Sequence, residues 1–122
     1  MKNSLVLAYL GDAVYELYIR EHLISMGISN VNDLQRKSLD FVSAKSQRKH
    51  LENLINDNVL TEEEIELSKR GRNAKGGKSK SSDIVTYRIA TGLEYVIGYL
   101  YLENKMSRIK EIMDYITKGC DE

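Results

Sequence analysis

The sequence predicts an all-α fold, and three observations support this prediction. The chain of 122 residues contains no Pro, which favours continuous helices over a β sandwich rich in turns. Apolar residues recur at spacings of three and four along most of the chain, which is the period of a helix face. No segment shows the alternation typical of a strand, and no internal repeat is present. The length predicts a single domain, residues 1–122.

The first predicted helix covers residues 4–26. Its apolar residues lie on opposite faces, so we expect this helix to be buried on all sides. Gly27 follows it as a stop of the C′ type. A second helical segment, capped by Asn32 or Asp33, extends to Phe41.

The third helix is predicted to begin near Ser43. Thr61 followed by Glu64 has the pattern of a capping box, which opens a short helix ending near Arg70. Acidic residues in its first turn and basic residues in its last suit the helix dipole. Two further amphipathic helices are predicted over about residues 84–103 and 105–118.

Composition excludes several classes of protein. A 42% apolar and 30% charged chain is typical of a globular protein. Its 18 basic and 18 acidic residues balance, so net charge does not indicate a nucleic-acid partner. The single cysteine, Cys120, excludes a disulfide framework. The longest apolar run, residues 5–10, is too short to span a membrane and lacks the features of a signal peptide, so we expect a cytoplasmic protein.

Two carboxylates interrupt the first apolar helix. Between residues 5 and 19 the only acids are Asp12 and Glu16, one helical turn apart. Burial of a lone carboxylate costs several kcal/mol unless it is paired or bound to a metal. Gly11 precedes Asp12, and a glycine inside a helix allows another backbone or a ligand to approach closely.

A third carboxylate, Glu94, falls inside the apolar stripe of the helix predicted over 84–103. Acids on two core helices suggest a site for a hard cation such as Mg²⁺, which prefers carboxylate oxygens and supports attack on a phosphate. Alternatively, the acids pair with an arginine such as Arg20 or Arg88, or lie at the rim of the core. Glu16 is expected to bond Arg20, and spacing leaves open whether it joins the site.

Basic residues are concentrated in one segment. The loop predicted over about residues 71–83 is rich in Gly, Ser and Lys, and we expect it to be mobile. The segment 69–80 holds six basic residues and no acid, which leaves 12 basic against 18 acidic residues elsewhere, a net charge of −6. Such a loop suits phosphate backbones, although a solvated surface loop is the alternative. A weaker basic cluster around Lys45 is more typical of a helix surface.

Two motifs resemble those of the ribonuclease III family. Residues 7–14, LAYLGDAV, resemble the family motif LEFLGDAV, and residues 93–102, LEYVIGYLYL, resemble FEALIGALYL. Together with VSAKSQ at 42–47 and RGRNAK at 70–75, they match the Mini-ribonuclease III branch, which lacks the double-stranded-RNA-binding domain. Two acids of full-length members are replaced, by Ala8 and Thr91, and this branch carries the same replacements.

The resemblance implies a homodimer that hydrolyses double-stranded RNA with Mg²⁺ and matures the paired ends of the 23S ribosomal RNA precursor in a bacterial cytoplasm. Asp12 and Glu94 would hold Mg²⁺. The expected RNA-binding residues are Lys45, Arg70, Arg72, Asn73, Lys75 and Lys78. The replaced acids motivate a second hypothesis, an inactive relative that serves as an RNA-binding ribosome-assembly factor. A third is a purely structural helical dimerisation module, against which the basic loop argues.

Overall fold

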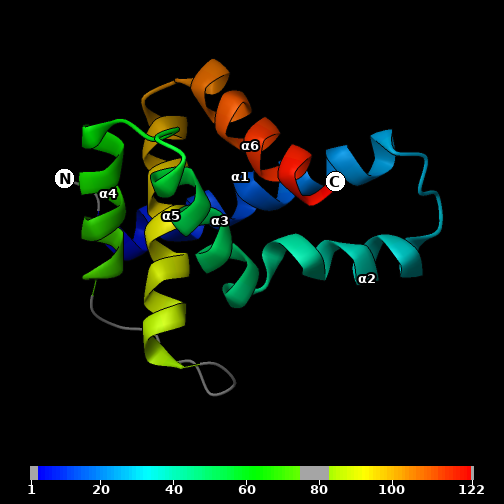
Figure 1. Ribbon diagram of the computed structural model, residues 1–122, viewed down its shortest axis with the longest axis horizontal. Helices are drawn as coiled ribbons and strands as arrows, with labels where there is room; N and C mark the ends of the chain where they lie inside the picture. Colours follow the sequence, from blue (N-terminus) through cyan, green and yellow to red (C-terminus); the bar gives the residue numbers. More distant parts are fainter. Residues whose placement is uncertain (1–2, 75–82, 122) are drawn as a thin grey trace.

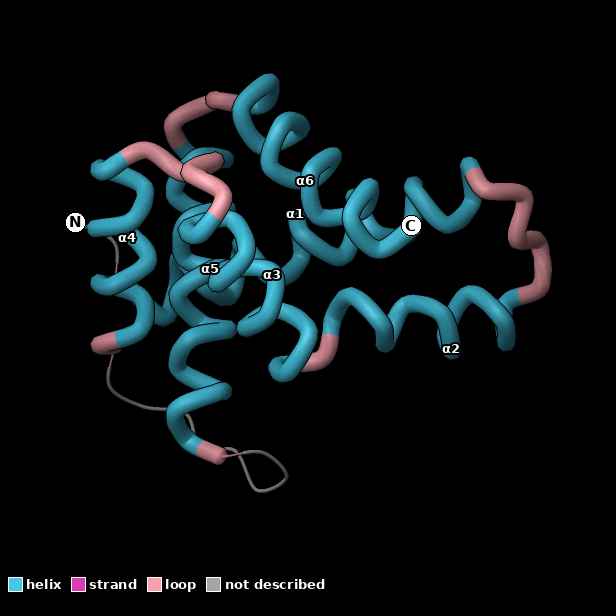
Figure 2. The backbone as a smooth tube through the Cα atoms, viewed as in Figure 1, coloured by secondary structure: helices cyan, strands magenta, loops and turns pink. Residues whose placement is uncertain are grey.

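The computed structural model describes residues 3–74 and 83–121, and all regular secondary structure in these ranges is helical (Figure 2). The helices are α1 (Ser4–Ser25), α2 (Val31–Val42), α3 (Ala44–Asn56), α4 (Glu62–Arg72), α5 (Ile84–Leu102) and α6 (Met106–Asp121). The predicted all-α fold is confirmed. Of the loop predicted over 71–83, residues 75–82 lie outside the described part of the chain.

Helix α5 forms the centre of the fold. Helices α1, α3 and α4 pack around it, α1 crossing behind it in Figure 1 and α4 lying beside it. The distal half of α1 extends past this body, where α2 packs against it and α6 covers part of it. None of the helices in the described ranges is long and apolar enough to cross a membrane.

Helix α1 is not buried on all sides, so that expectation is wrong. Tyr15 and Ile19 are fully buried, whereas Tyr9 is 83% exposed and Leu17 is 57% exposed. The exposed apolar residues form a stripe along the helix because they recur at roughly helical spacing. Nothing in the described parts of the chain covers that stripe completely.

Side-chain caps set the start of the next helices. The cap of α2 is Asn30, whose Oδ1 accepts the Asn32 N–H at 2.8 Å and the Asp33 N–H at 3.2 Å. The predicted caps, Asn32 and Asp33, are therefore wrong: they donate their N–H groups in the first turn. Helix α3 begins after Ser43 as predicted, and the Ser43 Oγ accepts the Ser46 N–H at 3.1 Å.

The capping box of α4 is confirmed. The Thr61 N–H donates to Glu64 Oε1 at 2.9 Å, and the Glu64 N–H donates to Thr61 Oγ1 at 3.1 Å. The helix continues through Gly71 to Arg72, beyond the predicted end at Arg70.

Gly71 is a packing residue and not the first residue of a loop. A Cβ atom at this position would lie 2.5 Å from the Tyr95 Cβ and 2.9 Å from the Gly92 Cα. The glycine lets α4 lie directly on α5. By contrast, Gly27 is the predicted stop of α1, with a φ of +89°.

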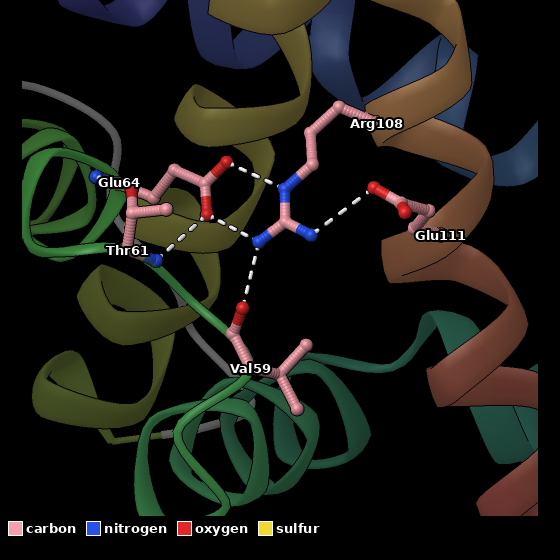
Figure 3. A network of polar contacts seen from close by, with 5 residues as sticks. All are labelled: Val59, Thr61, Glu64, Arg108 and Glu111. Carbon is pink, nitrogen blue, oxygen red and sulfur yellow. Dashed lines mark hydrogen bonds and ion pairs between the residues drawn. The ribbon is translucent and has the colours of Figure 1, made fainter.

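Arg108 of α6 binds the turn between α3 and α4 (Figure 3). Its Nε and Nη2 atoms donate to the two oxygens of Glu64 at 2.8 and 2.7 Å, and Nη2 also donates to the Val59 carbonyl at 2.7 Å. Glu64 is only 5% exposed. Burial acts to raise the pKa of this carboxyl, but the hydrogen bonds from Arg108 and Thr61 outweigh it and lower the pKa below its ordinary value.

Candidate active site

Two glycines allow α1 and α5 to cross with their backbones in contact. A Cβ atom at Gly11 would lie 1.7 Å from the Glu94 carbonyl oxygen, and one at Gly98 would lie 2.0 Å from the Leu7 carbonyl oxygen. Neither position tolerates a side chain at this separation. The expectation that Gly11 admits a close neighbour is confirmed, and the neighbour is the backbone that carries Glu94.

This crossing brings the side chains of Asp12 and Glu94 together. Both residues are partly exposed, and they share a hydrogen bond. Burial, the charge of Asp12 and the hydrogen bond to it together raise the pKa of the Glu94 carboxyl to about 8, burial having the largest effect. Glu94 therefore holds a proton at neutral pH, because two adjacent carboxylates without a cation repel each other.

In residues 3–74 and 83–121, the arginine pairing considered for these acids is found at Glu16 alone. Its carboxylate lies 3.8 Å from the Arg20 guanidinium, one turn along α1. Besides burial, the groups that act on the pKa of Glu94 are Asp12, Gln47 and, more weakly, Glu16, with no arginine among them. Glu16 contributes a negative charge near the pair.

The sequence analysis did not identify Gln47 as part of this site. Its side chain is 2% exposed and hydrogen-bonds Glu94, which lowers the pKa of that carboxyl against the other effects. The signal was a polar residue on an apolar helix face, since Gln47 lies four and seven residues before the buried Leu51 and Leu54.

The oxygens at this site fit a hard divalent cation. In residues 3–74 and 83–121, no three His, Cys, Asp or Glu side chains cluster in a way that would hold a metal. Two carboxylates and one neighbouring amide suit an ion such as Mg²⁺, which keeps several waters and takes few protein ligands. They do not suit zinc, whose structural sites use four nitrogen or sulfur ligands.

The expected RNA-binding residues lie at two places along α5, as far as the structure describes them. Arg70 and Arg72 are exposed in the last turn of α4, with Asn73 as its C-cap, and Lys45 is exposed at the start of α3. The last turn of α4 packs beside the middle of α5, at Gly92 and Tyr95. The start of α3 lies beside the start of α5, where Lys45 and Thr86 line one groove. Lys75 and Lys78 lie outside the described residues.

A direct contact ties the start of α3 to the start of α5. The Arg48 Nη1 donates to the Thr86 Oγ1 of α5 at 2.9 Å. Thr86 precedes Glu94 by eight residues, which is about 12 Å along the helix axis. The helix that bears Glu94 therefore also contacts the α3 end that carries Lys45.

Comparison with known proteins identifies the family. Residues 5–105 match the model of the ribonuclease III domain. The chain belongs to the ribonuclease III family. A Mini-ribonuclease 3 of Enterococcus faecalis is 44% identical over 121 residues, covering 98% of this chain and 92% of that protein. The Mini-ribonuclease 3 of Brevibacillus brevis is 49% identical over 114 residues, covering 93% and 84%. A crystal structure of a Fusobacterium nucleatum protein superposes with a TM-score of 0.84 at 37% identity, covering 97% of this chain and 93% of that one.

These comparisons confirm the resemblance to the Mini-ribonuclease III branch and make the protein an endoribonuclease. They support double-stranded RNA as its substrate. The hypotheses of an inactive assembly factor and of a purely structural module therefore give way to an enzyme. The pair of Asp12 and Glu94 is the candidate for its catalytic centre.

Proposed function

We propose that this ribonuclease III-family enzyme cleaves double-stranded RNA with Mg²⁺, and that its substrate is the paired 5′ and 3′ ends of the 23S ribosomal RNA precursor. The observation that carries the proposal is the partly exposed pair of Asp12 and Glu94 at the crossing of α1 and α5. Members of this family generally depend on a divalent metal. The proposed location is the bacterial cytoplasm, where ribosomal RNA is transcribed.

In this mechanism Asp12 and Glu94 would hold the cation. Both would then be carboxylates, because the charge of a cation would offset the repulsion that keeps a proton on Glu94. The bound Mg²⁺ would supply activation of water and stabilisation of the charge that develops on the phosphate. The rigid backbone crossing at Gly11 fixes the separation of the two carboxylates, so the protein does not need to rearrange to bind the cation.

The exposed basic residues bind the RNA backbone in this proposal. Arg70, Arg72 and Lys45 supply positive charge, and Asn73 supplies an amide donor; the proposed partners Lys75 and Lys78 belong to the same segment. A-form RNA is recognised through its shape, phosphates and 2′-hydroxyls, so we expect little sequence preference.

Replacement of Arg70 and Arg72 by Gln tests this role. We expect weaker binding to duplex RNA and a lower dependence of binding on salt, because fewer counterions are released. Lys105→Gln, in the turn between α5 and α6, is the control and leaves both quantities unchanged. If the double variant shows the same salt dependence as the wild type, the two arginines do not contact the RNA backbone and belong to the solvated surface.

We propose that the enzyme is a homodimer formed through the exposed face of α1. Its apolar stripe supports this: Val6, Tyr9, Leu17 and Ile24 are each at least half exposed in one chain. A groove of about 750 Å³ between α1 and α6 adjoins it and includes Leu17 and Tyr101 in its lining. An exposed apolar stripe of this kind on a single subunit is typical of an interaction surface.

Sedimentation tests the dimer. Leu17→Glu places a charge in the stripe, and we expect it to sediment as a monomer. Val85→Glu, at an exposed apolar position at the start of α5, is the control and remains dimeric. A Leu17→Glu protein that sediments like the wild type would place any interface elsewhere.

A cleavage assay tests the substrate and the cation. RNA that carries the paired ends of the 23S precursor is incubated with the enzyme in Mg²⁺ or in EDTA. Each single strand of the same RNA, without its complement, is the unpaired substrate for comparison. We expect cuts in both strands of the paired RNA, only with Mg²⁺. Cleavage of the unpaired ends, or cleavage in EDTA, contradicts the proposal.

A further inference from the structure

Gln47 is a buried polar residue that the proposed chemistry leaves unused. It is 2% exposed, and its Nε2 donates to the Val42 carbonyl across a long 3.4 Å. Its Oε1 has no hydrogen-bond partner in the part of the chain that the structure describes. Buried polar atoms are nearly always paired in native proteins, so this oxygen calls for a partner from outside the chain.

The neighbours of Gln47 restrict what that partner is. The side chain hydrogen-bonds Glu94, and a carboxylate accepts hydrogen bonds, so the amide N–H group faces it. The amide oxygen is then left beside a pair of carboxyl groups. With a cation bound, Asp12 and Glu94 are both carboxylates, whose oxygens accept hydrogen bonds and offer nothing to another acceptor. A cation, by contrast, satisfies all of these oxygens together.

Contacts on both sides of Gln47 hold the junction of α2 and α3 in place. Six residues before Gln47, near the end of α2, the Phe41 carbonyl accepts a 2.6 Å hydrogen bond from the Tyr15 hydroxyl of α1. Three residues after it, the His50 Nδ1 lies 3.1 Å from the same hydroxyl. The next residue, Arg48, bonds Thr86 of α5. Gln47 is thus fixed between the helix that carries Asp12 and the helix that carries Glu94.

We propose that Gln47 is a positioning residue of the cation site. Its amide N–H group orients the Glu94 carboxylate, and its amide oxygen faces the divalent cation as a third oxygen group beside Asp12 and Glu94. This inference rests on the proposed function, because it requires a cation at the carboxylate pair. It makes α3 a third wall of the site and gives the buried amide a role that packing alone does not.

The test replaces Gln47 by Met, which keeps the length of the side chain and removes the amide. Calorimetry measures Mn²⁺ binding to the full chain without RNA, and steady-state cleavage of an RNA duplex gives kcat and KM. We expect Mn²⁺ to bind about 10-fold more weakly and kcat to fall by a similar factor, as for other residues that orient metal ligands. KM for the RNA stays unchanged, because Gln47 is buried away from the duplex.

Gln35→Met is the matched control, since Gln35 is exposed on α2 and is the other glutamine of the chain. It retains wild-type Mn²⁺ binding and kcat. A melting curve of Gln47→Met separates the two roles of a buried amide: we expect the melting temperature to be retained or raised, because the orphaned acceptor is gone. Gln47→Asn keeps an amide on a shorter side chain and is measured in the same way. We expect it to lose less Mn²⁺ affinity and less kcat than Gln47→Met.

Wild-type Mn²⁺ affinity and kcat in Gln47→Met overturn the inference. A lower melting temperature with unchanged Mn²⁺ binding overturns it too, because it assigns Gln47 to packing alone. If the wild type binds Mn²⁺ and the Gln47 variants bind it equally well, the proposed function stands without a role for Gln47. If the wild type itself neither binds Mn²⁺ nor cleaves duplex RNA, the proposed function fails as well.

Discussion

Gly98→Ala is expected to damage the active site through the backbone while the fold survives. The added methyl group would lie 2.0 Å from the Leu7 carbonyl oxygen, whereas ordinary contact begins at 3.4 Å. To accommodate it, α1 and α5 must separate by about 1.4 Å, the difference between these distances. Because Gly98 lies one turn after Glu94, this separation moves the Glu94 carboxylate away from Asp12.

The expected magnitudes separate activity from stability. Overpacking a core costs about 1–3 kcal/mol, but Ala favours a helix over Gly by about 1 kcal/mol, so we expect a net loss of about 2 kcal/mol or less. A misplacement of about 1 Å at a catalytic site costs about 100-fold in rate, so kcat for duplex RNA should fall by about that factor. Urea unfolding and steady-state cleavage measure the two quantities.

Gly27→Ala is the matched control for Gly98→Ala. A Cβ atom at Gly27 meets nothing within 4 Å, but its φ of +89° is unfavourable for Ala, at a cost of about 1–2 kcal/mol. We expect this variant to lose stability and keep wild-type kcat. If Gly98→Ala also cleaves at the wild-type rate, the close crossing does not set the geometry of the site, and the reasoning is refuted.

Two further predictions concern stability. Arg108→Met leaves the buried Glu64 carboxylate without its partner and should lower the free energy of unfolding by about 3 kcal/mol. Lys110→Met, which breaks an exposed pair with Asp114 on the same helix, is the control and should have little effect. Equal losses of stability in urea unfolding would show that the buried pair does not stabilise the fold more than the exposed one. The pKa of His50 is lowered to about 4 by burial and by Lys49. Since the unfolded chain protonates this group below about pH 6.5, stability should fall between about pH 6.5 and 4 by up to about 3 kcal/mol, and a His50→Gln protein whose pH dependence equals that of the wild type would contradict this.

The sequence predicts the fold well where local signals agree. The capping box at Thr61 and the stop at Gly27 act within a few residues, and both occur as predicted. The start of α2 is harder to place because Asn30, Asn32 and Asp33 all have the chemistry of a cap. The end of α4 was misplaced for a different reason: Gly71 is typical of a loop locally, and only its contact with α5 explains a glycine inside the helix.

The site is less accessible to sequence reasoning because its members come from three helices. Asp12 and Glu94 stand out as charges on apolar helices, and their motifs resemble those of a known family, but spacing does not show that they touch. Their contact depends on the glycine crossing of α1 and α5. Gln47 could not be identified from the sequence, because a single uncharged glutamine on a helix face is not unusual. Its proposed role depends on Glu94, which lies 47 residues later in the chain.

Cleavage of a perfectly paired RNA by Asp12→Asn and Glu94→Gln tests the central claim most directly. Glu16→Gln is the matched control, because Glu16 lies one turn from Asp12 and pairs with Arg20 instead. Circular dichroism first checks that the wild type and the three variants are folded, and all are then assayed with Mg²⁺. We expect cleavage to be abolished in Asp12→Asn and Glu94→Gln and retained in Glu16→Gln. Cleavage by Asp12→Asn at the wild-type rate would contradict the assignment of the active site to this pair of carboxylates.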